Sequence, residues 1–345
     1  MKLLFKLAGV LVLVASLGTG WVWLKLDRFA NSPISLQQAR AFDVAPGSGV
    51  ARIARELAAQ GVIDDARAFV WLARWRQQAH RLQAGEYWLQ PGLSGEQLLA
   101  LLVAGKVRQH VFTIVEGWTF RQLRRALAAE PRIRHSLTGL SDAEVMARLG
   151  HPGEHPEGRF LPDTYHFPAG TRDVDFLQRA YQAMAEALER LWPQRQPDLP
   201  LASPYEALIL ASIVEKETAV AAERRQIAGV FIRRLRKGMR LQTDPTVIYG
   251  LGEDFQGNLR KRDLRRDTPY NTYRRRGLPP TPIALPGLDS LRAVLDPAPG
   301  EALYFVAKGD GRHHFSATLE EHNRAVRRYQ IHQRRTDYRS TPETP

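Results

Sequence analysis

Glu217 is the residue of this chain best placed to act as an acid or a base. It lies in a segment that predicts a helix, and a stripe of apolar side chains leads up to it along one helical face. The members of that stripe are Leu210, Ile213 and Val214. Apolar surroundings disfavour a charged carboxylate and raise its pKa, which suits a general acid near neutral pH. The alternative is that Glu217 is the solvated end of the helix, paired with Arg224 or Arg225.

The start of this helix is also readable. Ser203 suits the N-cap, Pro204 suits the first helical position, and Glu206 stands where it can complete a capping box. The neighbouring carboxylate, Glu215, is two residues from Glu217 and therefore faces elsewhere on the helix. Its predicted neighbours are Leu208, Ala211 and Ser212.

Polar side chains follow in a segment that we expect to be a rigid turn around Pro245. Between Leu241 and Gly250 they are Gln242, Thr243, Asp244, Thr246 and Tyr249. Two later stretches add Tyr270, Asn271 and Tyr273, and the proline-rich run Gly277 to Pro282. Several hydrogen-bonding side chains beside aromatic rings suit a polyhydroxylated ligand. A proline-stiffened surface loop is the alternative.

Periodicity and turn residues predict the elements that position these side chains. Helices are expected from Val174 to Leu191 and from Glu223 to Lys237, and a strand from Arg108 to Val115. A hairpin is predicted around residues 308–311, and a last helix near Thr318. The turn-rich stretch from Pro156 to Phe167 is interpreted as either a binding loop or a rigid corner.

A smaller module is predicted ahead of this region. A strand at residues 41–44, two helices and a strand at residues 85–90 make a strand–helix–helix–strand unit that is similar to a LysM module. Modules of that kind bind glycans. Its aromatic side chains could be core residues or a platform for sugars; they are Trp71, Trp75, Tyr87 and Trp88.

The N-terminus predicts a membrane anchor. No charge interrupts Leu7 to Leu24, and Trp21 and Trp23 stand where an interfacial belt would lie. A cleaved signal peptide is the alternative, but no small-residue cleavage site follows the apolar run. Lys2 and Lys6 predict a cytoplasmic N-terminus. Residues 31–40 are predicted to be a polar linker.

The amino-acid composition limits the kinds of ligand and partner that the chain is expected to bind. The formal net charge of +13 suits an anionic partner; the alternative is that the Arg-rich composition reflects a GC-rich genome. The chain has no cysteine, which excludes disulfides and thiolate metal sites. A metal site from His313, His314 and His322 is not expected, because adjacent histidines at a strand end are more often unrelated to metal. Nucleic acid is not expected either, because no base-stacking or groove-reading motif is present.

Four motifs in order resemble the MltG (YceG-like) family of endolytic murein transglycosylases. They are Ala211 to Thr218, Leu241 to Tyr249, Tyr270 to Tyr273 and Gly277 to Pro280. The resemblance covers nearly the whole chain and implies an α+β protein. Its expected parts are a transmembrane anchor (residues 1–30), a linker with a LysM-like βααβ module (31–108), a larger mixed α+β catalytic domain (109–334) and a disordered tail (335–345). Some relatives have glycine where this chain has Thr281.

The resemblance also implies an activity. Such enzymes cut the bond between N-acetylmuramic acid and N-acetylglucosamine, leave a 1,6-anhydro end and terminate nascent glycan strands. The essential glutamate falls on Glu217, acting as acid and then base without metal or cofactor. The predicted substrate-binding residues are Gln242, Asp244, Thr246, Tyr249, Tyr270, Asn271 and Tyr273. The implied location is the inner membrane, with a periplasmic catalytic domain, and peptidoglycan synthases are candidate partners.

Two other functions stay open at the level of sequence. A hydrolytic muramidase would pair Glu217 with a second carboxylate, either Asp244 or Glu215. A glycan-binding scaffold would act through the LysM-like module without catalysis. The product separates the enzymes, since hydrolysis leaves a reducing end and the lyase reaction an anhydro end.

Overall fold

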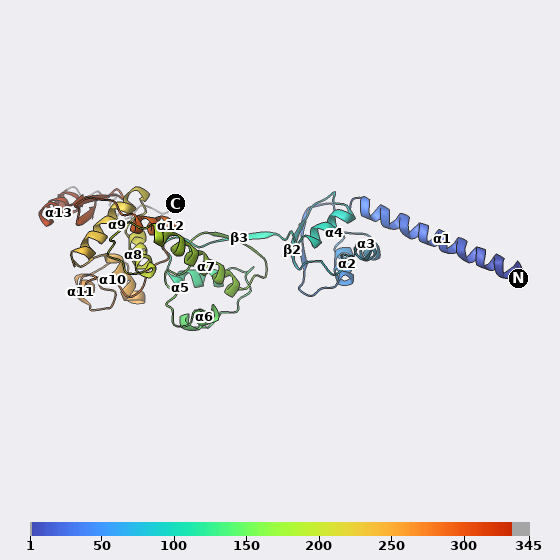
Figure 1. The fold of residues 1–345 in the computed structure, drawn as a ribbon, viewed down its shortest axis with the longest axis horizontal. Coiled ribbons are helices and arrows are strands. Elements are labelled where there is room, and N and C mark those ends of the chain that lie inside the picture. The colour runs from blue at the N-terminus through green and yellow to red at the C-terminus, as the bar shows by residue number, and fades with distance from the viewer. Residues whose placement is uncertain (1, 333–345) are drawn as a thin grey trace. The chain divides into compact units, whose positions relative to one another are not determined.

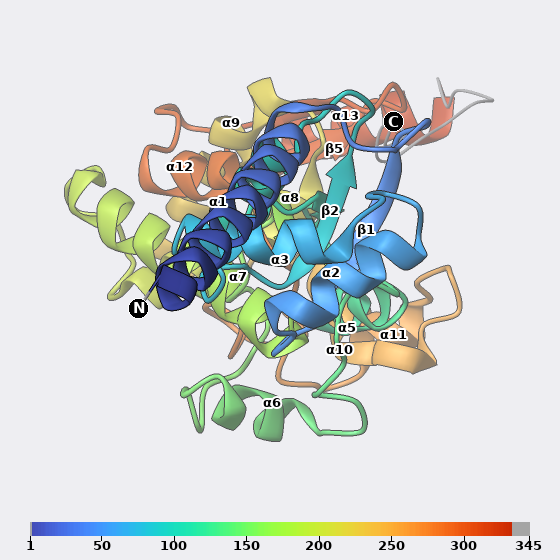
Figure 2. The same cartoon turned by 90° about the vertical axis from the view of Figure 1, so that its right-hand side faces the viewer.

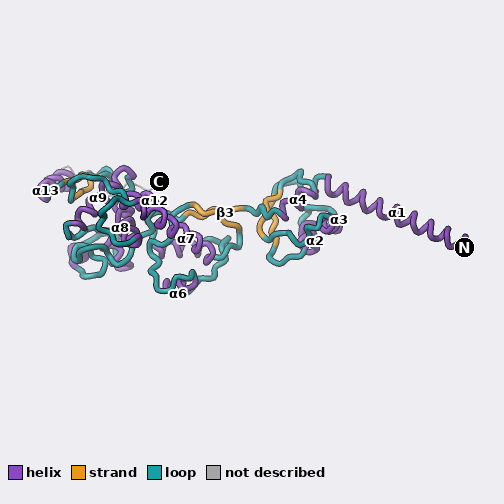
Figure 3. The backbone as a smooth tube through the Cα atoms, in the orientation of Figure 1, coloured by secondary structure: helices purple, strands orange, loops and turns teal. Residues whose placement is uncertain are grey.

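The computed structural model describes residues 2–332 and divides the chain into two units (Figure 1). The first comprises the described chain up to His110 with His166–Gly170, and the second comprises Val111–Tyr165 with the described chain from Thr171. Helices and loops make up most of both units, and the strands are short and paired in twos (Figure 3). The chain is thus a mixed α+β protein, as predicted.

The first unit begins with the long helix α1, Lys2–Asn31. The helix is long and apolar enough over Gly9–Asn31 to cross a membrane. The elements that follow are β1 (Arg40–Val44), α2 (Val50–Ala59), α3 (Ala66–Trp75), β2 (Gly85–Leu89) and α4 (Gly95–Val103). β1 and β2 pair antiparallel, so the predicted order of strand, two helices and strand is confirmed. Its likeness to a LysM module stays a prediction.

The prediction that residues 31–40 form a polar linker is corrected at two positions. Ile34 and Leu36 are buried in the core of the first unit. The amide of Ile34 donates to Leu93 O at 2.7 Å, and the amide of Ser35 donates to Val62 O at 3.1 Å. The average composition of the segment is polar, and it therefore did not predict that two apolar side chains within it are buried.

The second unit is built from short helices around α8, Pro204–Glu217. Its other elements are α5 (Phe120–Ala128), α6 (Asp142–Arg148), α7 (Asp173–Leu191), α9 (Ala221–Arg236), α10 (Asp244–Leu251), α11 (Lys261–Arg265), α12 (Leu288–Leu295), β5 (Tyr304–Ala307), β6 (His313–Ser316) and α13 (Leu319–Val326). β3 (Gln109–Thr113) pairs with β4 (Thr164–Pro168), and the division between the units runs through both strands. Short 3-10 turns at Trp192–Gln194 and Gly252–Asp254 and a π turn at Arg327–His332 complete it.

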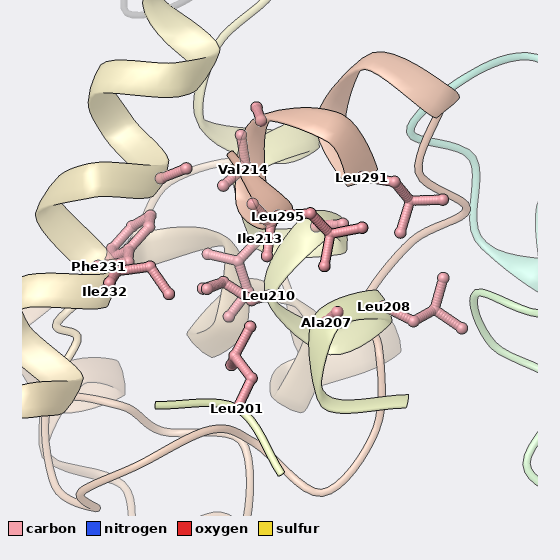
Figure 4. Packing of buried hydrophobic residues seen from close by; sticks show 14 of the residues in the cluster. Leu201, Ala207, Leu208, Leu210, Ile213, Val214, Phe231, Ile232, Leu291 and Leu295 are labelled. Atoms are coloured by element: carbon pink, nitrogen blue, oxygen red, sulfur yellow. The ribbon is translucent and has the colours of Figure 1, made fainter. Parts of the chain in front are cut away.

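Helix α8 is buried on every side between Ala207 and Val214, because α7, α9, α10 and α12 all contact it. Figure 4 shows Leu210, Ile213 and Val214 of α8 among the apolar side chains of α9 and α12. A helix surrounded in this way has little freedom to shift. The C-terminal end of α8 therefore gives Glu217 a fixed position.

Several predicted boundaries agree with the structure. Ser203 caps α8 by accepting the amide of Glu206, and the predicted hairpin is β5 and β6. The reciprocal half of the capping box is wrong, because Glu206 accepts from the amide of Ala202 at 2.6 Å instead of that of Ser203. The rigid turn predicted around Pro245 is also corrected. Pro245 lies in the first turn of α10, where a missing amide proton is tolerated. The predicted tail from residue 335 lies outside the described residues.

Candidate active site

The carboxylate of Glu217 meets the segment that leads into α10. The hydroxyl of Thr243 donates a short hydrogen bond to Glu217 Oε1. The ion pairs considered from the sequence do not form. Arg224 lies within 4 Å of Glu116, Glu215 and Asp289, while Arg225 pairs with Asp296 at 2.7 Å. Within residues 2–332, no basic side chain lies within ion-pair distance of Glu217.

Thr243 is itself fixed by a buried cluster of threonines. Its amide donates to Thr272 Oγ1 at 3.1 Å, and its carbonyl accepts from Thr246 Oγ1 at 2.8 Å. The hydroxyls of Thr246 and Thr272 are 2.9 Å apart. Gln242 precedes this cluster with a φ of 52°, a left-handed conformation that is uncommon for a residue with a side chain. The amide of Gln242 donates to Thr272 O at 3.2 Å, which helps to hold that conformation.

The surroundings raise the pKa of Glu217 from 4.5 to about 7. Burial is the main cause, because it disfavours the charged carboxylate, and the negative charge of Asp244 acts in the same direction. The Thr243 hydrogen bond and the positive charge of Arg234 act in the opposite direction. A carboxyl group with this pKa is populated in both protonation states near neutral pH. It can therefore donate a proton and then accept one.

Arg234 is buried, and its side chain donates hydrogen bonds to backbone carbonyl groups. Its guanidinium donates to Leu303 O at 2.6 Å and to Leu241 O at 2.8 Å. These bonds tie α9 to β5 and to the chain just before Thr243. Arg234 thus supports the geometry around Glu217 and adds a positive charge without forming an ion pair with it.

Asp244 is the carboxylate that the chain brings near Glu217. It is exposed, and the hydroxyl of Tyr273 donates to its Oδ1 at 2.6 Å. Burial is the main cause that raises the pKa of Tyr273, followed by the charge of Asp244, so the phenol keeps its proton. The pair joins the start of α10 to the loop after α11, beside the carboxylate of Glu217.

Tyr249 and Tyr270 form a second aromatic group on the same two segments. Their rings meet edge to face with centroids 4.9 Å apart. Tyr270 Oη lies 2.8 Å from Thr281 Oγ1, and Tyr249 Oη donates to Glu157 Oε2 at 3.1 Å. Both rings are partly buried and keep some surface accessible.

Glu157 is a buried carboxyl that the sequence did not single out. It accepts from the amide of Phe120 at 2.9 Å as well as from Tyr249, and burial raises its pKa to about 7. It lies in the turn-rich stretch that we interpreted as a binding loop or a rigid corner. The buried bonds favour the corner, because they fasten the stretch to α5 and α10.

Thr246 and Asn271, both predicted to bind substrate, are buried in the protein. The side-chain Nδ2 of Asn271 donates to Leu264 O at 3.1 Å and to Arg266 O at 2.6 Å, and its Oδ1 accepts from the backbone amide of Tyr273 at 2.9 Å. Such bonds clamp the loop that carries Tyr270 and Tyr273. The exposed or partly exposed members of the predicted set are Gln242, Asp244, Tyr249, Tyr270 and Tyr273.

Glu215 points away from Glu217, as the helical spacing predicted. It accepts from the amide of Gly287 at 3.0 Å and from Ser290 Oγ at 2.7 Å, and so holds the start of α12. Its side chain is 6% exposed. This role could not be predicted from the residues around Glu215, because α12 follows a proline-rich stretch and was not itself predicted.

The described residues contain no cluster of three or more His, Asp or Glu side chains arranged to hold a metal ion. His313, considered from the sequence, contacts Glu223 instead, with Nδ1 2.8 Å from Oε2. The amide of His313 also donates to Glu223 Oε1 at 2.9 Å, which ties β6 to α9.

Comparison with known proteins shows the family to which the chain belongs. A protein named endolytic murein transglycosylase from Bacillus subtilis (strain 168) is 32% identical over 304 residues, which cover 83% of this chain and 84% of the relative. The protein of that name from Streptococcus pneumoniae (strain D39) is 28% identical over 322 residues, covering 81% of this chain and 56% of the relative. The crystal structure of a YceG-like protein from Listeria monocytogenes matches with a TM-score of 0.53 and 31% identity, over 84% of this chain and 99% of that one. The YceG-like family model matches residues 42–328, and the chain belongs to the YceG-like family.

Proposed function

We propose that this chain is a membrane-anchored lytic transglycosylase that cuts peptidoglycan strands internally, with Glu217 as both acid and base. The family and the names of the curated relatives support a lytic transglycosylase, which is a lyase. The observation that carries the choice of residue is the Glu217 carboxyl, with a pKa near 7 and a hydrogen bond from Thr243. Glu215, two residues earlier on α8, is instead engaged with the start of α12.

The reaction needs one carboxyl group in two successive steps. Protonated Glu217 donates its proton to the oxygen that leaves C1 of N-acetylmuramic acid, and the bond to N-acetylglucosamine breaks. The substrate's own N-acetyl group stabilises the positive charge that develops at C1. The Glu217 carboxylate then accepts the proton of the muramic O6 hydroxyl, whose oxygen bonds to C1. The acid is restored, no water is consumed, and a 1,6-anhydro end remains.

The other predicted site residues take two kinds of role in this proposal. Gln242, Asp244, Tyr249, Tyr270 and Tyr273 have surface from which to contact sugars or stem peptide. Thr246 and Asn271 act indirectly, because they fix the segments that carry those side chains. Thr243, which was not in the predicted set, orients the Glu217 carboxylate and adjusts its pKa.

A hydrolytic muramidase is the second candidate, because Asp244 is an exposed carboxylate close enough for its charge to raise the pKa of Glu217. A carboxylate in that position could activate a water molecule that attacks C1. Asp244 Oδ1 already accepts a hydrogen bond from the Tyr273 hydroxyl at 2.6 Å, which leaves it less free to activate water and favours the lyase. Glu215 is not a suitable second carboxylate, because its Oε2 already accepts hydrogen bonds from the Gly287 amide and the Ser290 hydroxyl at the start of α12.

Helix α1 supplies the proposed anchor, and Lys2 and Lys6 favour a cytoplasmic N-terminus with the catalytic unit in the periplasm. The strand–helix–helix–strand order in the first unit supports a LysM-like role in holding glycan. An enzyme anchored in this way would meet strands that are still attached to the membrane. Termination of nascent strands, alongside peptidoglycan synthases, is the corresponding cellular role.

The test is digestion of purified peptidoglycan with the wild type and with Glu217→Gln, followed by mass spectrometry of the released muropeptides. We expect anhydro-ended products from the wild type and none from the variant. Reducing ends from the wild type would favour the muramidase. If neither protein released products while both bound glycan, a scaffold acting through the LysM-like module would replace the enzyme.

A further inference from the structure

Helix α3 exposes a face that combines two indole rings with two guanidinium groups. Trp71 and Trp75 are 36% and 68% exposed, although large aromatic side chains are usually buried in a domain of this kind. Arg67 and Arg74 are exposed on the same helical face, since the positions 67, 71, 74 and 75 follow helical spacing. The opposite face of α3 packs into the core through Phe69 and Leu72.

Helix α3 lies beside α1, and α1 is joined to the module without a flexible linker. Figures 1 and 2 show α3 next to the end of α1 that enters the module, and the two helices are in contact. Phe29 of α1 packs edge to face on Phe69 of α3 with ring centroids 6.4 Å apart. A side chain at Gly95 would come within 2.5 Å of the Phe29 carbonyl oxygen, so α4 also fits closely against α1. Lys25 pairs with Asp65, the N-cap of α3, at 2.5 Å.

An apolar groove of about 610 Å³ lies between α1 and α3. Its lining residues are Gly18, Thr19, Val22, Trp23, Leu26 and Trp75. The hydroxyl of Thr19 donates to Ser16 O at 3.0 Å, so the one hydroxyl of the lining is already satisfied within α1. The groove therefore offers contact surface to hydrocarbon and little hydrogen bonding to a sugar.

The position of the groove along α1 identifies what fills it. The uncharged run of α1 ends at Leu24, so Val22, Trp23 and Leu26 lie where a spanning helix leaves the hydrocarbon for the headgroups. Trp75 shares the groove with these residues and therefore lies at the same depth. Indole rings favour that depth, and guanidinium groups there attract anionic lipid headgroups.

We propose that the exposed face of α3 is a membrane-binding surface that holds the first unit against the lipid bilayer, with acyl chains in the groove beside Trp75. The proposal rests on α1 being a transmembrane anchor. Trp71 and Trp75 join Trp21 and Trp23 in one interfacial belt, while Arg67 and Arg74 bind lipid phosphates. The module then rests on the membrane at a fixed depth instead of moving freely around the end of its anchor.

The absence of cysteine from the chain allows a direct test by site-directed spin labelling. Single cysteines replace Trp71, Trp75, Leu13 or Ala41 in the full-length protein, which is reconstituted in lipid nanodiscs and labelled with a nitroxide. Leu13 reports the anchor, and Ala41 is an exposed control on β1, whose partner strand β2 lies on the side of the module away from α1 (Figure 1). Each tryptophan variant retains the other tryptophan, and neither change opens the core.

The readout is the ratio of nitroxide collisions with oxygen, which concentrates in lipid, to collisions with a water-soluble nickel chelate. We expect ratios at positions 71 and 75 several-fold above that at 41. Ratios at 71 and 75 equal to that at 41, with a high ratio at 13, would overturn the proposal and leave the anchor intact. A low ratio at 13 as well would reject the anchor and the proposal together. Immobilisation of labels at 71 or 75 by added glycan strands, in place of lipid contact, would make the face a sugar platform.

The charge of the face is tested by lipid composition. Nanodiscs of phosphatidylglycerol should lower nickel-chelate collisions at position 71 below those measured in phosphatidylcholine, and Arg67→Gln with Arg74→Gln should abolish the difference. Equal collisions in both lipids before the arginines are replaced would contradict the assigned role of the two guanidinium groups.

Discussion

Replacement of Thr243 with valine should raise the pKa of Glu217 above its wild-type value of about 7. The threonine hydroxyl donates to Glu217 Oε1, and this bond stabilises the charged carboxylate. Valine has nearly the same shape and leaves the backbone bonds of residue 243 to Thr272 and Thr246 in place. The substitution therefore removes one hydrogen bond and little else.

The size of the effect follows from the energy of such a bond. A hydrogen bond to a charged group contributes about 1.5–3 kcal/mol. One pKa unit corresponds to about 1.4 kcal/mol, so the pKa of Glu217 should rise by about one unit. Part of the loss is offset, because Glu217 is partly accessible and water can replace the hydroxyl.

The assay is the pH dependence of kcat/KM on purified glycan strands. The first step needs protonated Glu217, so activity should fall as pH rises through the pKa of the free enzyme. In Thr243→Val this fall should move to higher pH by about one unit. Thr113→Val is a matched control, because it removes a threonine hydroxyl that contacts Thr164 Oγ1 at 3.1 Å, on the β3–β4 pair. A fall that stays in place, or moves to lower pH, would refute the assigned role of Thr243.

Three further predictions concern the carboxylates near the end of α8. Asp244→Asn should move the same fall in activity to lower pH, because the charge of Asp244 raises the pKa of Glu217; no movement in the pH–rate profile would contradict this. Since the pKa of Glu217 is raised in the folded state, from 4.5 to about 7, its protonated form stabilises the fold at low pH and that contribution is lost as pH rises between these values. The unfolding free energy of Glu217→Gln should therefore fall less between pH 5 and pH 8 than that of the wild type, by about 1–3 kcal/mol. Denaturant unfolding in detergent measures this difference. An equal fall in both proteins would argue against the raised pKa. Glu215→Ala should lower the unfolding free energy by about 1–3 kcal/mol, because the amide of Gly287 and the hydroxyl of Ser290 lose their acceptor. Its pH–rate profile should nevertheless match that of the wild type. A displaced profile would give Glu215 a part in catalysis.

Local signals were sufficient for the elements that hold Glu217. Ser203 and Pro204 marked the start of α8, and the apolar spacing up to Val214 indicated where the carboxylate would point. These features act within one or two helical turns, so they can be recognised along the chain. The hydrogen bond from Thr243 could not be recognised in this way, because its position depends on how α10 packs against α8.

Two predictions based on local composition, a turn at Pro245 and a linker at residues 31–40, differ from the structure. Pro245 suggested a turn, but in the first helical turn a proline has no hydrogen bond to lose, and α10 begins there. Residues 31–40 looked like a linker because most of them are polar. Ile34 and Leu36 nevertheless pack into the core of the first unit, while most of their neighbours in the segment stay exposed.

The buried roles of Thr246, Asn271 and Glu157 illustrate a different limit. Their types suit substrate binding and structural hydrogen bonding equally well, and only burial separates the two. The carbonyls that Asn271 holds belong to Leu264 and Arg266, in a stretch that offered no periodic signal. Residue type therefore indicated a candidate site, and packing determined which of its side chains face outward.

The central claim is that Glu217 alone serves as acid and then base, so that the muramic O6 hydroxyl and not water attacks C1. Digestion of purified glycan strands in ¹⁸O-labelled water tests this most directly, with products analysed by mass spectrometry. We predict anhydro ends without ¹⁸O from the wild type and no cleavage by Glu217→Gln. Reducing ends that carry ¹⁸O, or continued cleavage by the variant, would contradict the account.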